Sequence, residues 1–190
     1  MDRGPAIFWT LIAVLLGASV YLGVGAERLR TELQQAKGAV STGDVVTLGS
    51  VIDGDTLQMH TERGEAVTIR VVGVKAFDAG AKDDTGAFGQ RAMDELQRLL
   101  EGKRVRVEVN DPPRDSHGRT LATLYLDDED VGLSLVRSGT SLVYTSHPFP
   151  AMPQYLQEQG VARGERRGLW ANREATARAD GLARQWGRPK

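Results

Sequence analysis

The sequence predicts an α+β, mainly β fold: a five-stranded OB-type Greek-key barrel with three helices, preceded by one transmembrane helix and followed by a C-terminal helix. Three observations support this prediction. Five segments between residues 45 and 126 have the residue types or the alternating polarity of β-strands. One amphipathic helical pattern separates the third strand from the fourth, as in small OB barrels. A long apolar stretch without charges precedes them all.

The first element is this apolar stretch, which has no charged residue over 4–26. A helix of about 20 apolar residues spans the hydrocarbon core of a bilayer. Trp9 and Tyr21 lie near the two ends, as interfacial aromatic residues do. A cleaved signal peptide is the alternative, because Val24-Gly25-Ala26 has the small residues of a cleavage site. We favour a retained membrane anchor at residues 1–26.

The next segment, residues 27–43, is predicted to be a helical extension followed by a short linker. The main domain then covers residues 44–170, and residues 171–190 form a basic C-terminal helix or tail. Which side of the membrane holds the domain is ambiguous. The positive-inside rule favours the cytoplasm, because more basic residues follow the span than precede it. A short N-terminus before a signal-like segment instead indicates export, so we favour a periplasmic or extracytoplasmic domain.

The strands of the barrel are predicted from β-branched residues and from alternation along short runs. Between them we expect a polar loop at residues 75–85 and a proline-containing loop at 111–118. The predicted strands are residues 45–51, 56–61, 66–74, 105–109 and 119–126.

The helices are predicted at residues 86–102, 131–138 and 153–164, with the C-terminal helix over 171–186. In the first of them Met93, Leu96, Leu99 and Leu100 form one apolar stripe, so we expect these side chains in the core. Trp170, at the end of the main domain, is also expected to be a core residue.

Composition limits the chemistry that the chain can perform. Because the chain has no cysteine, disulfides, thiolate zinc sites and cysteine nucleophiles are excluded. Residues 41–162 contain 12 Lys and Arg against 19 Asp and Glu, whereas residues 163–190 contain 8 against 3. An acidic body argues against a broad nucleic-acid surface. The basic tail could contact anionic lipid, RNA or an acidic partner, although a solvated surface helix explains it too.

Four residues of one turn, Asp53-Gly54-Asp55-Thr56, are the first candidates for chemistry. Two carboxylates flanking a glycine can face one cleft from the end of a strand and hold a hard cation. Two arginines, Arg70 and Arg119, follow on strand-like segments and could clamp a phosphate. Together these residue types indicate phosphodiester chemistry.

Five motifs in this order resemble those of the staphylococcal nuclease (thermonuclease) family. The resemblance covers roughly residues 44–170 and implies a five-stranded OB barrel with three helices. It also implies a calcium-dependent phosphodiesterase that cleaves DNA and RNA. The motifs are Val51-Ile-Asp-Gly-Asp-Thr56, Ile69-Arg-Val-Val-Gly-Val74, Asp115-Ser-His-Gly-Arg-Thr-Leu-Ala122, Leu135-Val-Arg-Ser-Gly139 and Gly168-Leu-Trp170.

The resemblance assigns roles to individual residues. Asp55 matches a calcium ligand, and Asp53 matches a carboxylate that supports the water shell of the metal. Arg70 and Arg119 match the two arginines that bind phosphate. Such guanidinium groups pair with two phosphate oxygens and stabilise the charge of the transition state.

The end of the third strand departs from the family pattern, which has an acid, a proline and a glutamate there. In this chain Lys75 replaces the second calcium-binding carboxylate and Phe77 replaces the proline. Asp78 matches the general-base glutamate but is one methylene shorter. Placing a cation at position 75 costs calcium affinity about 100-fold or more, so we expect calcium binding to be weak or absent.

Lys75 could instead act as a fixed cation on a phosphate group, which is our hypothesis for its role. His117 stands where the family often has tyrosine, and Tyr144 and His147 lie in a segment whose family equivalent contacts the base. We therefore include Lys75, His117 and Tyr144 as candidate substrate-binding residues.

Two functions remain open. The first is a membrane-anchored phosphodiesterase acting on nucleic acid, with Arg70 and Arg119 holding the phosphate and Asp78 activating water. The second is a catalytically inactive accessory subunit that docks onto a membrane protein partner through the barrel or the C-terminal helix. The two arginines favour the first function, whereas Lys75 and the additional tail favour the second.

Overall fold

The computed structural model describes residues 40–187, which belong to one compact unit that begins at Val40. The predicted anchor or signal peptide over residues 1–26 lies outside the described residues, and so does most of the extension and linker. Among residues 40–187, no helix has both the length and the apolar character needed to cross a bilayer.

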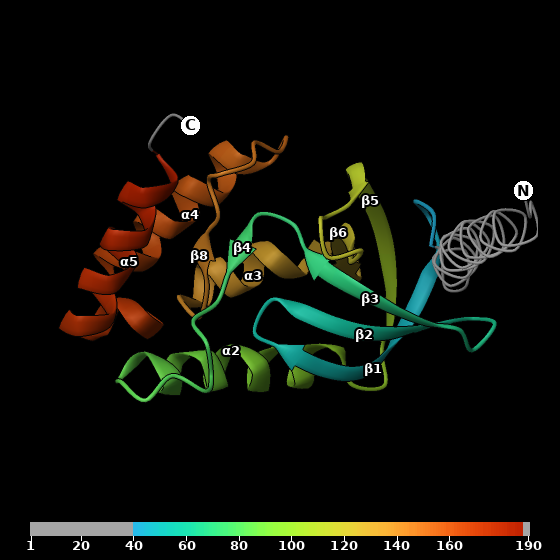
Figure 1. Ribbon diagram of the computed structural model, residues 1–190, viewed down its shortest axis with the longest axis horizontal. Helices are drawn as coiled ribbons and strands as arrows, with labels where there is room; N and C mark the ends of the chain where they lie inside the picture. The colour runs from blue at the N-terminus through green and yellow to red at the C-terminus, as the bar shows by residue number, and fades with distance from the viewer. Residues whose placement is uncertain (1–39, 188–190) are drawn as a thin grey trace, which may run out of the picture. The chain divides into compact units, whose positions relative to one another are not determined.

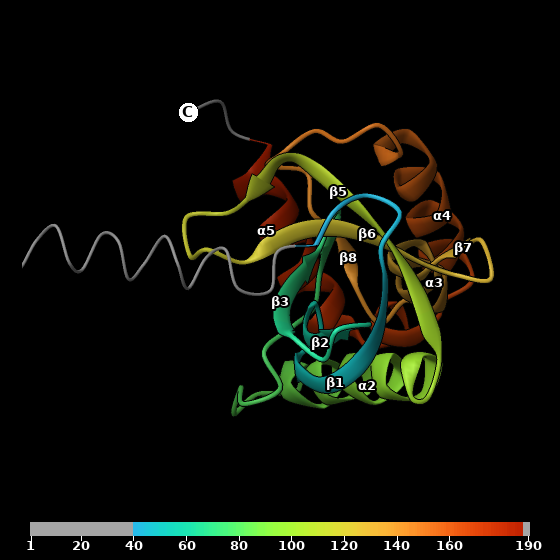
Figure 2. The same ribbon diagram turned by 90° about the vertical axis from the view of Figure 1, so that its right-hand side faces the viewer.

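Five strands form a closed barrel, in the order β3-β2-β1-β5-β6 with β3 returning to β6 (Figures 1 and 2). Neighbouring strands are antiparallel except β3 and β6, which pair in parallel through Arg70 opposite Leu121 and close the barrel. This confirms the predicted barrel of the OB type. The strands are β1 Val45–Asp53, β2 Thr56–Thr61, β3 Ala66–Val71, β5 Arg104–Arg114 and β6 Thr120–Leu126.

Three two-residue strands complete the sheets. Strand β7 (Glu129–Asp130) pairs with the end of β6. Strand β4 (Val74–Lys75) pairs with β8 (Leu142–Val143) and forms a separate small sheet. The β4–β8 pair is important for the site, because it fixes the backbone position of Lys75 beside the segment that leads to Tyr144.

Four α-helices are present among the described residues, as predicted. They are α2 Thr85–Leu100, α3 Val131–Ser138, α4 Met152–Gly164 and α5 Arg173–Trp186, with a 3-10 turn at Gly168–Ala171 before α5. The caps agree with the helix boundaries: the side chain of Asp130 accepts a hydrogen bond from the Leu133 amide, and Asn172 does the same for Ala175. Gly139 ends α3 with a φ of 73°, a conformation that favours glycine.

The buried apolar side chains form two clusters. The first fills the barrel and the space beneath α2 and α3, and it includes Leu57, Ile69, Leu96 and Leu124. The second lies between α5 and the loop that follows β4. Its members are Phe77, Phe88, Leu142, Ala162, Leu169, Trp170, Ala175 and Ala179. Trp170 is therefore a core residue, as predicted, and the second cluster joins α5 to the rest of the described unit.

The structure differs from the predictions in several places. The third strand was predicted over residues 66–74, but β3 ends at Val71, and Val74–Lys75 belongs to the separate β4–β8 pair. The loop predicted at 111–118 begins later, because β5 continues to Arg114, which lies opposite Thr120. The β5–β6 register shifts between Val109 and Arg114, and this irregularity accommodates two prolines that cannot donate ladder hydrogen bonds. Met93 and Leu99 were expected in the core but are only half-buried, because the buried face of α2 is centred on Ala92 and Leu96.

Candidate functional site

The turn between β1 and β2 places Asp55 inside the end of the barrel. A register irregularity between Val51 and Asp53 precedes the turn, and Asp53 Oδ1 accepts a hydrogen bond from the Asp55 amide at 2.9 Å. Gly54 lies tightly against two neighbours: a Cβ there would be 2.5 Å from that of Ala76 and 2.7 Å from that of Ala92. Glycine is therefore required between the two acids, and Asp55 itself is 0 % exposed.

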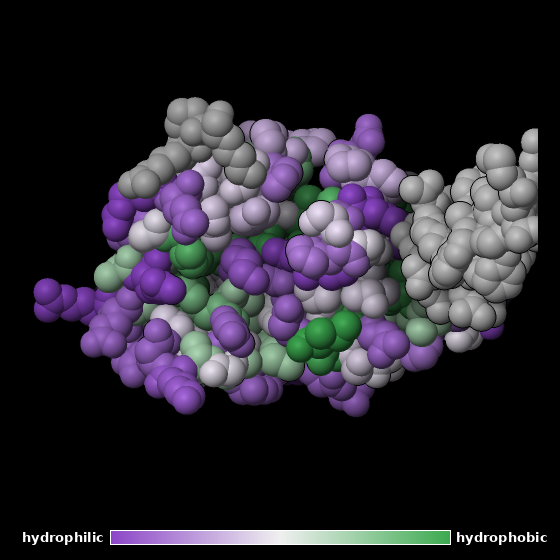
Figure 3. Space-filling view, in the orientation of Figure 1, coloured by the Kyte–Doolittle hydropathy of each residue, from purple (hydrophilic) through white to green (hydrophobic). Residues whose placement is uncertain are grey.

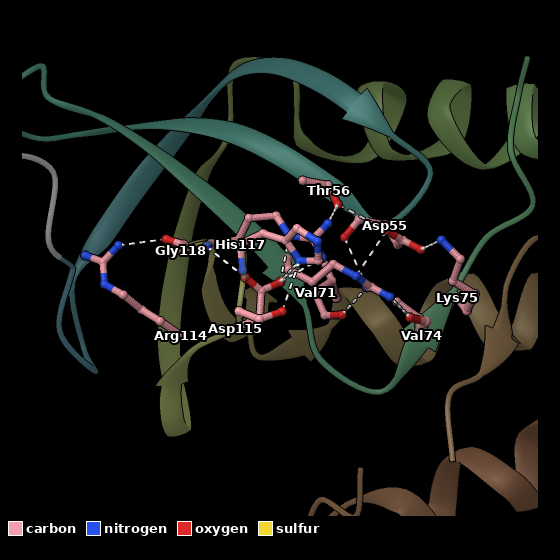
Figure 4. A network of polar contacts seen from close by, with 12 residues as sticks. Asp55, Thr56, Val71, Val74, Lys75, Arg114, Asp115, His117 and Gly118 are labelled. Carbon is pink, nitrogen blue, oxygen red and sulfur yellow. Dashed lines mark hydrogen bonds and ion pairs between the residues drawn. The ribbon is translucent and has the colours of Figure 1, made fainter. Parts of the chain in front are cut away.

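The buried carboxylate of Asp55 has four donors. Lys75 Nζ lies 3.0 Å from Oδ2, and the amide of Ala76 donates to the same oxygen at 3.1 Å. Arg70 Nε lies 3.2 Å from Oδ1, and the Thr56 hydroxyl donates to Oδ1 at 3.1 Å. Figure 4 shows the Lys75 side chain directed at Asp55 from one side, with Thr56 on the other. Both oxygens of Asp55 are thus engaged by donors of this chain.

These contacts have opposite effects on the pKa values of the two acids. Burial by itself raises the pKa of Asp55, but Arg70, Asp53 and Lys75 outweigh burial and lower the pKa. The pKa of Asp53 is raised, first by burial and then by the adjacent Asp55. Asp55 is therefore a stabilised anion, whereas the ionised form of Asp53 is disfavoured.

Arg70 on β3 is almost completely buried and bonded to the backbone around it. Its Nη1 donates to the carbonyls of Asp55 and Val71 at 3.3 and 2.7 Å, and its Nη2 donates to the Val74 carbonyl at 2.6 Å. Burial lowers the pKa of Arg70 and the Asp55 anion opposes this change. All three nitrogens of the side chain have partners inside the protein, so direct phosphate binding by Arg70 stays a prediction.

Arg119 is held in place by Asp115, a residue that sequence reasoning did not single out. Arg119 Nε and Nη2 both lie 2.7 Å from Asp115 Oδ2, while the amides of Arg119 and His117 donate to Oδ1. Burial of Asp115 raises its pKa, but the hydrogen bonds from Arg119 and His117 more than compensate and lower it. The signal for this pair that the sequence offers is an aspartate four residues before an arginine, with a glycine between them.

Thr56 joins the two parts of the site. Its hydroxyl accepts a hydrogen bond from Arg119 Nη1 at 3.2 Å while it donates to Asp55. A continuous chain of contacts thus runs from Asp115 through Arg119, Thr56 and Asp55 to Lys75 (Figure 4). The sequence motif contains Thr56, but nothing in its spacing indicated this linking role.

The remaining predicted residues differ in their exposure and in their contacts. The Lys75 side chain is 43 % exposed and that of Arg119 is 30 % exposed, so both cations reach solvent. His117 is exposed beside Asp115, and Tyr144 is half-buried next to β4, where its amide donates to the Gly73 carbonyl. Asp78 is exposed on the loop after β4, and its Oδ1 accepts a hydrogen bond from the Gly80 amide.

Metal ligands are few at this site. Residues 40–187 contain no group of three or more histidine, cysteine, aspartate or glutamate side chains that could hold a metal ion. Asp53 and Asp55 are the two carboxylates of the turn, and the ammonium of Lys75 lies beside Asp55. The expected weakness of calcium binding is not tested by these observations.

A scan against protein-family models matches residues 68–172 to the staphylococcal nuclease homologue family. Helix α5, which begins at Arg173, lies beyond the matched residues. The matched segment includes Arg70, Lys75, Asp78, Asp115 and Arg119.

Known proteins with similar sequences include nucleases. Protein ParB of Escherichia coli is 32% identical over 142 residues, which are 70% of this chain and 74% of ParB. An uncharacterized endonuclease of Haemophilus influenzae is 30% identical over 64% of each chain. A thermonuclease of Staphylococcus intermedius is 32% identical over 99 residues, 51% of this chain and 58% of that protein. The chain therefore spans only about six tenths of the length of the last two relatives.

Proposed function

The chain belongs to the staphylococcal nuclease homologue family, and from this premise we propose that residues 40–187 form a phosphodiesterase domain acting on nucleic acid. One observation supports the proposal most. Arg119 is oriented by Asp115 on one side and connected through Thr56 to the buried Asp55–Arg70 pair on the other. A partly exposed guanidinium fixed in this way is suited to hold a phosphate without reorganisation.

The proposed reaction is hydrolysis of a phosphodiester bond. Arg119 and Lys75 neutralise the charge of the phosphate oxygens. The buried Arg70 adds to the positive electrostatic potential of the site. Asp78 accepts a proton from the attacking water, whose oxygen bonds to phosphorus as one phosphorus–oxygen ester bond breaks. The leaving oxygen takes a proton from solvent. His117, beside Asp115, and Tyr144, beside β4, are the proposed substrate-binding residues.

Calcium fits these residues poorly, and we propose that the site is degenerate as a calcium site. Calcium needs six to eight oxygen ligands at about 2.3–2.6 Å. Each oxygen of Asp55 already has two donors, and the ammonium of Lys75 would repel a divalent ion. Lys75 then supplies the positive charge that a metal would otherwise supply, so the proposed activity is slow and independent of calcium.

The proposal is tested by incubating the full chain with single-stranded DNA, once with calcium and once with a chelator. We expect slow cleavage in both, abolished by Arg119→Ala. Arg104→Ala is the matched control, because Arg104 is an exposed arginine on β5 that pairs with Glu62. Cleavage that requires calcium would contradict the assignment to Lys75, and cleavage that persists in the Arg119 variant would contradict the site.

A second candidate is a catalytically inactive module that serves as an accessory or docking subunit of a membrane protein complex. The observation that favours it is Lys75, together with helix α5, which lies outside the family match. On the face drawn in Figure 3, apolar side chains of the described residues occur in small groups among hydrophilic ones. A partner on that face would therefore have to bind mainly through polar contacts. Absence of cleavage under every condition would favour this second function.

We also propose that residues 1–26 anchor the protein in a membrane and that the domain lies on the periplasmic or extracytoplasmic side. Support comes from the uncharged apolar stretch at residues 4–26 and its terminal aromatic residues. The test is fractionation of cells followed by an alkaline wash of the membranes. An anchored chain stays in the membrane pellet at full length, whereas a cleaved signal peptide gives a shorter, soluble product.

A further inference from the structure

Three aromatic side chains gather at the edge of the site. The ring centroid of Tyr144 lies 5.7 Å from that of His147, with an interplanar angle of 33°. It lies 5.0 Å from that of Trp186, with an interplanar angle of 82°, which is an edge-to-face contact. Tyr144 and His147 follow strand β8, whereas Trp186 is the last residue of α5.

These aromatic residues adjoin the cations of the site. The Tyr144 amide donates to the Gly73 carbonyl, and the preceding residue, Val143, pairs with Val74. The Val74 carbonyl in turn accepts a hydrogen bond from Arg70. An electrostatic interaction with Tyr144 also opposes the lowering of the Arg70 pKa by burial. The aromatic group is therefore next to the strand that supplies Lys75 and holds Arg70.

None of the three rings is fully buried. His147 is exposed, and Tyr144 and Trp186 are half-buried. Trp186 does contact the second apolar cluster, as Leu182 one turn earlier does. Packing explains an apolar residue at position 186, and the partial exposure of the ring leaves part of its surface open to solvent. A tryptophan set edge-on against Tyr144 beside a phosphate-binding site has the geometry of a base-binding surface.

We propose that Trp186 completes an aromatic base-binding surface with Tyr144 and His147, so that helix α5 forms part of the nucleic-acid site. This inference rests on the proposed function. An unpaired base can stack on aromatic side chains while its phosphate is held by neighbouring cations. Contacts with Trp186 and His147 restrict the Tyr144 ring, which reduces the entropy lost on stacking. Helix α5 lies beyond the residues that the family model matches, so the match assigns no role to Trp186.

The test compares the binding of two fluorescent oligonucleotides to the full chain. One is a short oligodeoxythymidylate and the other has the same length and backbone charge but no bases. Anisotropy is measured at low temperature in chelator, immediately after mixing, so that slow cleavage does not interfere. The variants are Trp186→Leu, which keeps an apolar side chain, and Leu182→Ala, which removes a neighbouring packing residue from the same helix.

We expect Trp186→Leu to weaken oligodeoxythymidylate binding about tenfold and to leave binding of the abasic strand unchanged. Leu182→Ala should bind both strands as the unsubstituted protein does. If Trp186→Leu and the unsubstituted protein bind the base-containing strand with equal affinity, this inference is overturned and the proposed function is not. An equal loss for both strands would also overturn it, because Trp186 would then act through structure. If the unsubstituted protein binds neither strand, the proposed function fails and the inference fails with it.

Thermal unfolding accompanies the binding measurements. Trp186→Leu and Leu182→Ala are both expected to unfold cooperatively within a few degrees of the unsubstituted protein, because both residues are only partly buried. If Trp186→Leu does not fold, Trp186→Phe replaces it. Phenylalanine keeps an aromatic face, so this variant should retain most of the preference for the strand that contains bases, and loss of that preference would overturn the inference.

Discussion

The ammonium of Lys75 lies 3.0 Å from Oδ2 of Asp55, whose other oxygen pairs with Arg70. Two cations of the chain, Lys75 and Arg70, lie against the charge of the buried aspartate. These three residues form an internal ion-pair network, and the lysine side chain is partly open to solvent. This relationship leads to the first prediction.

Lys75→Asp should create calcium affinity. The substitution removes the cation beside Asp55 and places a third carboxylate next to Asp53 and Asp55, which changes the local charge by two units. At an effective dielectric near 20, a divalent ion about 4 Å from a unit charge interacts by about 8 kcal/mol. Because solvent removes most of this energy, we expect calcium to bind about 100-fold more tightly than to the unsubstituted protein. Isothermal titration calorimetry measures the difference.

The matched control for this prediction is Lys82→Asp, which makes the same charge change at an exposed lysine further along the same loop. It should leave calcium binding as weak as in the unsubstituted protein. Tight calcium binding by the unsubstituted protein would contradict the idea that Lys75 replaces the ion. Equal gains in the two variants would show that net charge alone controls the affinity.

Asp55→Asn should destabilise the fold. Arg70 is 8 % exposed, and without the anion its charge is left buried and without a compensating carboxylate. Breaking such a pair costs about 3 kcal/mol in the free energy of unfolding. Urea unfolding at neutral pH measures the loss.

The pH dependence of this loss has a definite sign. Because the pKa of Asp55 is lowered in the folded state, its ionisation stabilises the fold above the unfolded pKa of about 3.9. This stabilisation disappears as the pH falls through the lower folded pKa, so the variant and the unsubstituted protein should converge in acid. Asp53→Asn is the control: the pKa of Asp53 is raised, so its ionisation opposes folding and its removal should cost little near pH 7. A constant difference at all pH values would contradict this account.

The barrel was predictable from the sequence because its strands and helices follow local patterns. Alternation in β5 and the apolar stripe of α2 need no tertiary information to recognise. The family motifs then gave the positions of Asp55, Arg70 and Arg119 and the departure at Lys75. The structure brings these residues into one network of contacts, and their role in a functional site stays a prediction.

The sequence could not supply the contacts between distant segments. Asp115 and Thr56 were visible only as parts of motifs, because their roles depend on how β2 and β6 meet across the barrel. The engagement of Arg70 with three backbone carbonyls was equally hidden. Trp186 was an apolar position in a predicted tail helix, and only the packing of α5 brings it beside Tyr144. Such pairings depend on topology, which periodicity does not encode.

Asp115→Asn should weaken phosphate binding more than it weakens the fold. The amide oxygen of asparagine can still accept hydrogen bonds from the amides of His117 and Arg119, but the charge that fixes the guanidinium is lost. A guanidinium that is no longer held must be ordered by the substrate, and we expect about tenfold weaker binding of single-stranded DNA. Anisotropy titration measures this change, and thermal unfolding should shift by only a few degrees. Unchanged DNA affinity would contradict the positioning role of Asp115.

Gly54→Ala should disturb both the fold and the site, because the turn has no room for a side chain. The added Cβ would lie 2.5 Å from Ala76 Cβ and 2.7 Å from Ala92 Cβ, both on backbone that cannot rotate away. Relief of these contacts moves the turn away from α2 and separates Asp55 from Lys75. The free energy of unfolding should fall by about 1–3 kcal/mol. Chemical unfolding measures the cost. Gly160→Ala in α4 is the control: nothing lies within 4 Å of its added Cβ, so the better helix propensity should stabilise slightly. If the two variants are equally stable, the claim that the Asp53–Asp55 turn packs tightly against Ala76 and Ala92 is contradicted.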